Sequence, residues 1–239
     1  SPQGVDFAAI AVQERGDGTR ADFYEKGQKV GSFELPLPCR HNLSNATAAL
    51  AACRIEGVSF AELRQAVAAL QPPGRRFDFR GSWQGRLVVD DYAHHPSEVD
   101  ATLATARLMV SSGRSTLPEP PQRLLAIFQP HRYSRTAEFL EPFAQALTQA
   151  DAVILAPLYA AGEDPIPGIS SAALAAAIGR LKPDLPVAIT ASLDELTDAV
   201  VERSQAGDLV LAMGAGDVNG LWSRLQQRQE RSTAVPLAA

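Results

Sequence analysis

Three polar clusters in the sequence each follow a short apolar run, and they hold most of the residues that can do chemistry. The clusters are residues 90–96 (DDYAHHP), 129–136 (QPHRYSRT) and 214–217 (GAGD). Three of the four histidines lie in the first two clusters, and the fourth is His41. Imidazole titrates near neutral pH, so this grouping indicates a site for acid–base chemistry.

Two arginines of the second cluster, Arg132 and Arg135, adjoin a turn that contains Pro130 and His131. Two guanidinium groups three residues apart suit the binding of an anionic group. The alternative is a pair of solvated surface charges. The adjoining Pro-His turn favours anion binding.

Other cluster residues have simpler explanations that compete with function. Paired aspartates at a strand end often cap the next helix, so capping and function explain Asp90 equally well. His94 and His95 are adjacent, and without a cysteine or a Glu-x-x-His motif a metal site there is disfavoured. The Gly214-Ala215-Gly216 turn is half of a dinucleotide fingerprint and follows the last strand, which favours a structural turn.

Two segments outside the clusters carry further candidate contacts. Asn42 at a helix start is explained as an N-cap, whereas Asn45, about one turn in, is a candidate for a base-edge or side-chain contact. The segment 74–77 (GRRF) is equally compatible with a basic hinge and with a ligand contact.

The elements that position these residues follow from hydrophobic periodicity and turn residues. Alternation between residues 7 and 35 predicts short antiparallel strands, and helices follow at 41–57 and, from a Ser59–Glu62 capping box, through residue 70. Beyond residue 83, apolar strands alternate with helices, which predicts an α/β fold with a mostly parallel, Rossmann-like sheet covered on both faces. The predicted strands are 86–89, 124–128, 152–156, 187–190 and 209–213. The predicted helices are 97–110 (capped by Ser97), 137–150, 172–181, 192–204 and one near 221.

In such sheets ligands bind outside the carboxyl ends of the strands, which is where the three clusters fall.

Composition excludes several classes of protein. The 239 residues are 46% hydrophobic and 21% charged, which is typical of a globular protein, and the net charge of −5 argues against nucleic-acid binding. No apolar run reaches the ~20 residues of a membrane span, so no membrane insertion is predicted. Cys39 and Cys53 do not form a disulfide framework, which favours a cytoplasmic location. The segment begins without Met or a signal peptide, so we expect a piece of a longer protein.

The sequence resembles the Mur ligases of peptidoglycan synthesis over nearly its whole length. The motifs that carry the resemblance, in family order, are 41–46 (HNLSNA), 75–77 (RRF), 90–96, 128–136 (FQPHRYSRT), 159–163 (YAAGE), 165–168 (PIPG) and 214–218 (GAGDV). The HHP and QPHR runs are most similar to members that add L-alanine to UDP-N-acetylmuramate. The member that recycles murein tripeptide also has an HHP run and is the nearest alternative.

The family has three domains, and the resemblance implies a division of this chain. Residues 1–71 are expected to be the end of the central α/β ATP-binding domain, 72–82 a hinge, 83–225 the C-terminal ligase domain and 226–239 a flexible tail. No G-x-x-x-x-G-K-[S/T] motif occurs. The N-terminal part of the ligase, with most Mg²⁺ ligands, is therefore expected outside this chain, which alone should not turn over. Cys39 stands where the family usually has glycine, and the loop 111–122 is longer than usual.

The resemblance also implies a reaction and roles for particular residues. ATP would convert the carboxylate of UDP-N-acetylmuramate to an acyl phosphate, which the amine of L-alanine then attacks. ATP is expected to lie against four residues, with the adenine near the first two and the ribose near the others: His41, Asn45, Arg76 and Asp91. The alanine site is expected to comprise five residues: Tyr92, His94, His131, Arg132 and Arg135.

The last four of these are the candidate catalytic residues. The arginines would bind the alanine carboxylate, and His94 or His131 would hold the amine or act as its base. A non-catalytic module that binds a nucleotide or an amino acid is the alternative from a different class.

Overall fold

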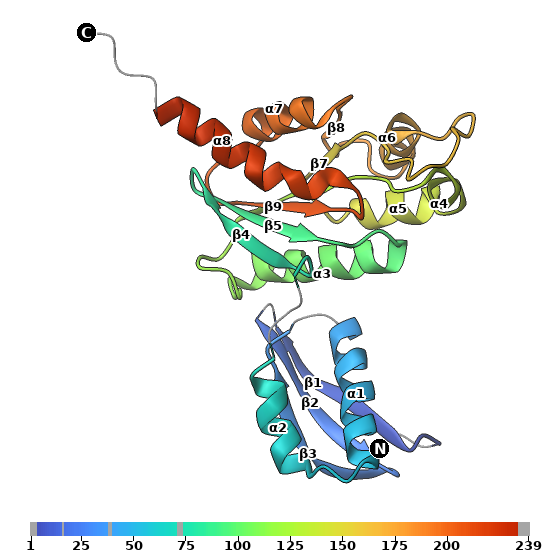
Figure 1. Cartoon of the computed structure of the whole chain (residues 1–239), viewed down its shortest axis with the longest axis vertical. Coiled ribbons are helices and arrows are strands. Elements are labelled where there is room, and N and C mark those ends of the chain that lie inside the picture. Colours follow the sequence, from blue (N-terminus) through green and yellow to red (C-terminus); the bar gives the residue numbers. More distant parts are fainter. Residues whose placement is uncertain (1–3, 16, 38–39, 71–73, 234–239) are drawn as a thin grey trace.

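The computed structural model describes residues 4–15, 17–37, 40–70 and 74–233. An N-terminal region is built on a small antiparallel sheet, and a larger C-terminal region is built on a six-stranded sheet (Figure 1). Among the described residues, no helix combines the length and the apolar character that crossing a lipid bilayer requires.

The N-terminal region has three antiparallel strands with two helices packed on the sheet. Its elements are β1 (Phe7–Arg15), β2 (Gly18–Glu25), β3 (Gln28–Leu35), α1 (Arg40–Ile55) and α2 (Phe60–Ala68). The predicted capping box is confirmed, because the Glu62 N–H donates to Ser59 Oγ at 3.3 Å and the Ser59 N–H donates to the Glu62 carboxylate at 3.1 Å. An N-cap at Asn42 is wrong, because α1 already begins at Arg40.

The C-terminal region confirms the predicted α/β fold. Its strand order is β4-β5-β9-β6-β7-β8, in which β4 is antiparallel to β5 and the other pairs are parallel. The strands are β4 (Asp78–Trp83), β5 (Arg86–Asp91), β6 (Arg123–Phe128), β7 (Ala152–Leu155), β8 (Val187–Ile189) and β9 (Asp208–Met213). The helices are α3 (Pro96–Ser112), α4 (Tyr133–Glu138), α5 (Leu140–Leu147), α6 (Ser171–Leu181), α7 (Leu193–Arg203), the short 3₁₀ helix η1 (Asp217–Gly220) and α8 (Leu221–Thr233).

Each face of this sheet buries its own apolar core. Side chains of α3, α5 and α6 cover one face, and those of α7 and α8 cover the other. Central strands covered on both faces must be apolar on both, which explains their continuous apolar runs.

One strand lies in the segment that was predicted to be a hinge. Strand β4 occupies residues 78–83 and pairs with β5, so the hinge predicted at 72–82 is wrong for residues 78–82. The sequence does not indicate this strand, because Gly81 interrupts the alternation of side chains that predicts one. A Cβ at Gly81 would lie 2.6 Å from the Trp222 ring of α8, so the ring packs directly on the strand backbone.

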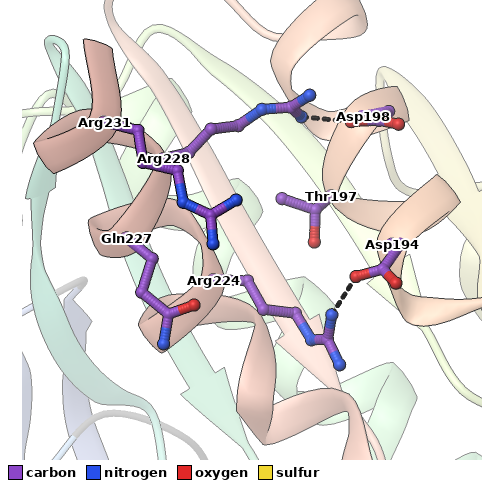
Figure 2. Close-up of a pocket in the computed structure, with 7 residues that line it drawn as sticks. All are labelled: Asp194, Thr197, Asp198, Arg224, Gln227, Arg228 and Arg231. Atoms are coloured by element: carbon purple, nitrogen blue, oxygen red, sulfur yellow. Dashed lines mark hydrogen bonds and ion pairs between the residues drawn. The ribbon is translucent and has the colours of Figure 1, made fainter. Parts of the chain in front are cut away.

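Helix α8 continues to Thr233, so the flexible tail predicted from residue 226 is wrong as far as residue 233. Arg224 pairs with Asp194 of α7, and Arg228 pairs with Asp198 one turn further along both helices (Figure 2). Residues four apart share one face of a helix, so these two pairs bind α8 along the length of α7. Residues 234–239 of the predicted tail lie outside the described residues.

Two helices begin earlier than the sequence predicts. The N-cap of α3 is His95 rather than Ser97, with Pro96 in the first turn and Glu98 completing a capping box. The helix predicted from residue 137 is split into α4 and α5, and α4 already begins at Tyr133. Part of the second polar cluster is therefore helical.

Candidate functional site

The three polar clusters meet because β9 lies between β5 and β6 in the sheet. Asp91 at the end of β5 and Phe128 at the end of β6 are both paired in register with Met213 at the end of β9. The carboxyl ends of the three strands are therefore level, and the loops that follow them emerge side by side. This confirms the predicted placement of the clusters at one edge of the sheet.

The Asp91 side chain binds the backbone of two segments at this edge of the sheet. The residue is 8% exposed, and its carboxylate accepts hydrogen bonds from the backbone N–H groups of Phe77 and Ala93, both at 2.7 Å. Burial raises the pKa of Asp91 to about 6, although these two hydrogen bonds favour the ionised form. A contact of Asp91 with a ribose remains a prediction. In this structure both carboxylate oxygens of Asp91 accept hydrogen bonds from backbone N–H groups.

Asp90, which is buried, and Arg75, which is partly buried, form an ion pair next to Asp91. Arg75 Nε donates to Asp90 at 3.0 Å, and Arg75 Nη2 donates to the Gly214 carbonyl at 2.7 Å. The Tyr92 N–H donates to the Arg75 carbonyl, and the guanidinium lies 4.9 Å from the centre of the Tyr92 ring. Helix capping by Asp90 is therefore wrong, and Arg75 anchors the GRRF segment to the sheet. The neighbouring Arg76 side chain is exposed.

Two of the predicted histidines come together, and His95 does not join them. The rings of His94 and His131 are 6.2 Å apart, and the His94 ring lies edge-on to Tyr92 at 5.1 Å. His94 Nδ1 is 2.9 Å from the Tyr92 carbonyl oxygen and 3.3 Å from the Glu98 carboxylate. His95 instead caps α3, and its ring packs against Phe139.

His131 is held between an aromatic ring and an arginine. Its ring stacks on Tyr159, with ring centres 5.4 Å apart and planes 10° from parallel. Arg135 Nη1 is 3.3 Å from His131 Nδ1. Burial, and then the positive charge of Arg135, lowers the pKa of His131. His131 is therefore neutral at neutral pH.

Arg132 lies beside the same histidine but is bound on one side by an acid. Arg132 Nε donates to Glu163 at 2.6 Å, and Arg132 Nη2 is 3.3 Å from Ser134 Oγ. Together with Arg135, it places two guanidinium groups around His131. The predicted alanine-site residues Tyr92, His94, His131, Arg132 and Arg135 thus belong to one edge of the sheet.

Gln129 was part of a recognised motif, but the sequence indicated no role for it. The residue is 2% exposed, and its side-chain amide donates to Asp217 at 2.7 Å and accepts from the Val218 N–H at 3.0 Å. A Cβ at Gly216 would lie 2.4 Å from Gln129 Oε1. The glycine turn after β9 is therefore a packing feature, as predicted. The amide of Gln129 ties it to the end of β6.

The predicted adenine contacts lie in the other region of the chain. Asn45 is exposed on α1, and its side chain makes no hydrogen bond to a described residue. The His41 side chain and Cys39 lie outside what the structure describes. No group of three or more His, Cys, Asp or Glu residues among those described is arranged to hold a metal ion.

Known proteins are similar to this chain in sequence and in fold. The model of the family described as Mur ligase, glutamate ligase domain, matches residues 75–216. A UDP-N-acetylmuramate–L-alanine ligase of Parasynechococcus marenigrum (strain WH8102) is 64% identical over 225 residues, which are 94% of this chain and 48% of that protein. The chain spans about half the length of the curated relatives it matches.

Two solved structures resemble the chain in fold. A UDP-N-acetylmuramate–alanine ligase from Thermotoga maritima has a TM-score of 0.76 at 22% identity, over 97% of this chain and 47% of that one. A MurF ligase from the same organism, in complex with ADP, has a TM-score of 0.63 at 18% identity, over 95% of this chain and 48% of that one.

Proposed function

Since the chain belongs to the Mur ligase family, we propose that it carries the acceptor site of an ATP-dependent ligase that joins L-alanine to UDP-N-acetylmuramate. The observation that carries the proposal is the meeting of His94, His131 and two arginines where β5 and β6 end. The name of the 64% identical relative supports L-alanine as the acceptor over murein tripeptide.

The arginines are proposed to bind the acceptor carboxylate. Carboxylates and guanidinium groups form charge-assisted, often bidentate hydrogen bonds. A bound carboxylate would fix the α-amine near the two imidazoles and hold it for attack on the acyl phosphate. Positioning of this kind supplies much of the rate enhancement in a two-substrate reaction.

The hydrogen bonds of the histidines distinguish their roles. His94 Nδ1 faces a carbonyl oxygen and a carboxylate, neither of which donates, so this nitrogen carries the proton. In neutral His94 the lone pair is then on Nε2, which makes no hydrogen bond within the described residues and is suited to accept a proton from the amine. His131 Nδ1 faces the Arg135 donor, so its Nε2 carries the proton and is a donor. We therefore assign the base to His94.

The nucleotide is proposed to bind between the two regions of the ligase. The exposed Arg76 and Asn45 are the candidate contacts, and Asp91 supports Arg76 by fixing the backbone of Phe77. The ADP bound to the MurF ligase supports ATP as the energy source. Mg²⁺ would assist phosphoryl transfer, and we place its ligands in the half of the relatives that this chain does not match.

The experiment that tests this function measures phosphate release from ATP and Mg²⁺ with UDP-N-acetylmuramate and individual amino acids. The longest product of the gene and this 239-residue chain are assayed in parallel. Release that depends on L-alanine in the long product supports the ligase. Release only with the tripeptide L-alanyl-γ-D-glutamyl-diaminopimelate and free UDP-N-acetylmuramate would indicate the recycling enzyme. Binding of a nucleotide or an amino acid, with no phosphate release under any of these conditions, would indicate a non-catalytic module.

A further inference from the structure

Glu163 lies outside the polar clusters that the sequence singled out, yet it binds three groups of the second cluster. It accepts hydrogen bonds from the Ser134 N–H at 2.9 Å, from Ser134 Oγ at 2.7 Å and from Arg132 Nε at 2.6 Å. Its side chain is 23% exposed. The hydrogen bonds from Ser134, and then the charge of Arg132, lower the pKa of Glu163 to about 2, so the carboxylate stays ionised at neutral pH.

The loop that carries Glu163 is itself fastened to the second cluster. The Tyr159 N–H donates to the Pro130 carbonyl, and the Arg132 N–H donates to the Tyr159 carbonyl, both at 2.8 Å. The Tyr159 ring stacks on His131 and also lies against Gly216, where an added Cβ would come within 2.8 Å of the ring. Glu163 therefore approaches Arg132 from a fixed direction.

The backbone at Arg132 also depends on its surroundings. Its φ of 73° lies in the left-handed region, which residues with a side chain adopt rarely and which is common at functional sites. Ser134 stands two residues later in the first turn of α4, and Glu163 binds both residues. One carboxylate thus holds this backbone conformation and the side chain that it presents.

The contacts of Arg132 leave part of its guanidinium available. Nε and Nη2 face Glu163 and Ser134, whereas Nη1 makes no hydrogen bond within the described residues. A guanidinium has five N–H donors in a planar fork, so a second carboxylate can bind the remaining edge.

We propose that Glu163 is a positioning residue of the acceptor site, which fixes one edge of Arg132 so that the other edge binds the carboxylate of the acceptor amino acid. This inference rests on the proposed function. Glu163 would act through Arg132 and would not touch the substrate itself.

The test compares Glu163→Gln with Glu141→Gln in the longest product of the gene. Glu141 pairs with Arg180 at the same 2.6 Å, but both side chains are 60% exposed and the pair joins α5 to α6 rather than any of the polar clusters, which makes it a matched control. Glutamine can still accept from Ser134, but it loses the charge. A neutral hydrogen bond is about half as strong as a charge-assisted one, so the KM for L-alanine should rise about tenfold. The kcat, the KM for ATP and the melting temperature should stay near the wild-type values, and Glu141→Gln should change none of them.

An unchanged KM for L-alanine in Glu163→Gln would overturn the proposal. So would a lower melting temperature together with equal impairment of kcat, the KM for L-alanine and the KM for ATP. If another amino acid supports turnover, its KM is read in the same way. If no amino acid does, the proposed function fails by itself. The Arg132 Nε–H resonance of this chain then decides by NMR: loss of its protection against exchange in Glu163→Gln supports the positioning role, and retained protection overturns it.

Discussion

Two groups of arginines in the C-terminal region look alike in sequence but have different structural surroundings. One contains Arg132 and Arg135 at the edge of the sheet. The other is a groove of about 270 Å³ between α7 and α8, and its lining includes Arg224, Arg228 and Arg231 (Figure 2). In the groove the pairs follow the regular spacing of two straight helices. At the edge of the sheet, Arg132 has a left-handed backbone and a partner held by a second loop.

The comparison teaches that the surroundings of an arginine, rather than its charge, indicate a binding site. The groove pairs are solvent-exposed, and the side chain of Asp194 is 85% exposed. Such pairs contribute about 0–1 kcal/mol each to stability and are screened by salt. The edge of the sheet instead combines packed glycines, stacked rings and unusual backbone conformations, which persist only where other contacts enforce them.

The largest effect should come from the histidine assigned as base. His94→Gln in the longest gene product should lower kcat by about 100-fold or more, which is the usual contribution of general acid–base catalysis. His95→Asn keeps an N-cap residue on α3 and should leave kcat within about twofold, because asparagine is a favourable N-cap. Steady-state phosphate release measures both. Equal effects of the two variants would remove the distinction between the adjacent histidines.

A smaller effect is expected at two glycines four residues apart, one in the turn after β9 and one at the end of η1. Gly216→Ala places a Cβ against Gln129 and Tyr159 and should destabilise this chain by about 1–3 kcal/mol, as overpacking does. Gly220→Ala meets no atom within 4 Å and should change stability by less than about 1 kcal/mol. Denaturant unfolding of this chain gives both values. A neutral Gly216→Ala would show that the turn after β9 is loosely packed.

The smallest effect should come from the groove. Arg228→Ala removes one exposed ion pair with Asp198 and should cost less than about 1 kcal/mol, decreasing as salt is added. Hydrogen exchange of the α8 amides at low and high salt reports this locally. A loss well above this value, independent of salt, would mean that the groove is a built site rather than a contact between helices.

The sequence predicted the strands and most helices because apolar runs and capping residues are local signals. It also placed the clusters at strand ends, but it could not show that β9 separates β5 from β6, since strand order depends on tertiary packing. Strand β4 was not predicted because Gly81 has low strand propensity. The glycine is explained by its close contact with the Trp222 ring, which the sequence does not show. Helix α8 had a readable signal in the matched spacing of Arg224 and Arg228 with Asp194 and Asp198.

The roles of Glu163 and Gln129 could not be predicted in the same way. Both act through hydrogen bonds to residues from 29 to 89 positions away, which leave no periodic trace in the sequence. Likewise, the separation of His94 from His95 depends on which of them caps α3.

The central claim is that the edge of the sheet, and not the groove, binds the acceptor amino acid. The most direct test is the KM for L-alanine of Arg132→Ala and Arg228→Ala in the longest gene product, with the KM for ATP measured beside it. Loss of a charge-assisted contact of about 2–3 kcal/mol should raise the KM for L-alanine about 30- to 150-fold in Arg132→Ala. The KM for ATP should stay near wild type, and Arg228→Ala should change neither constant. An unchanged KM for L-alanine in Arg132→Ala would contradict the account.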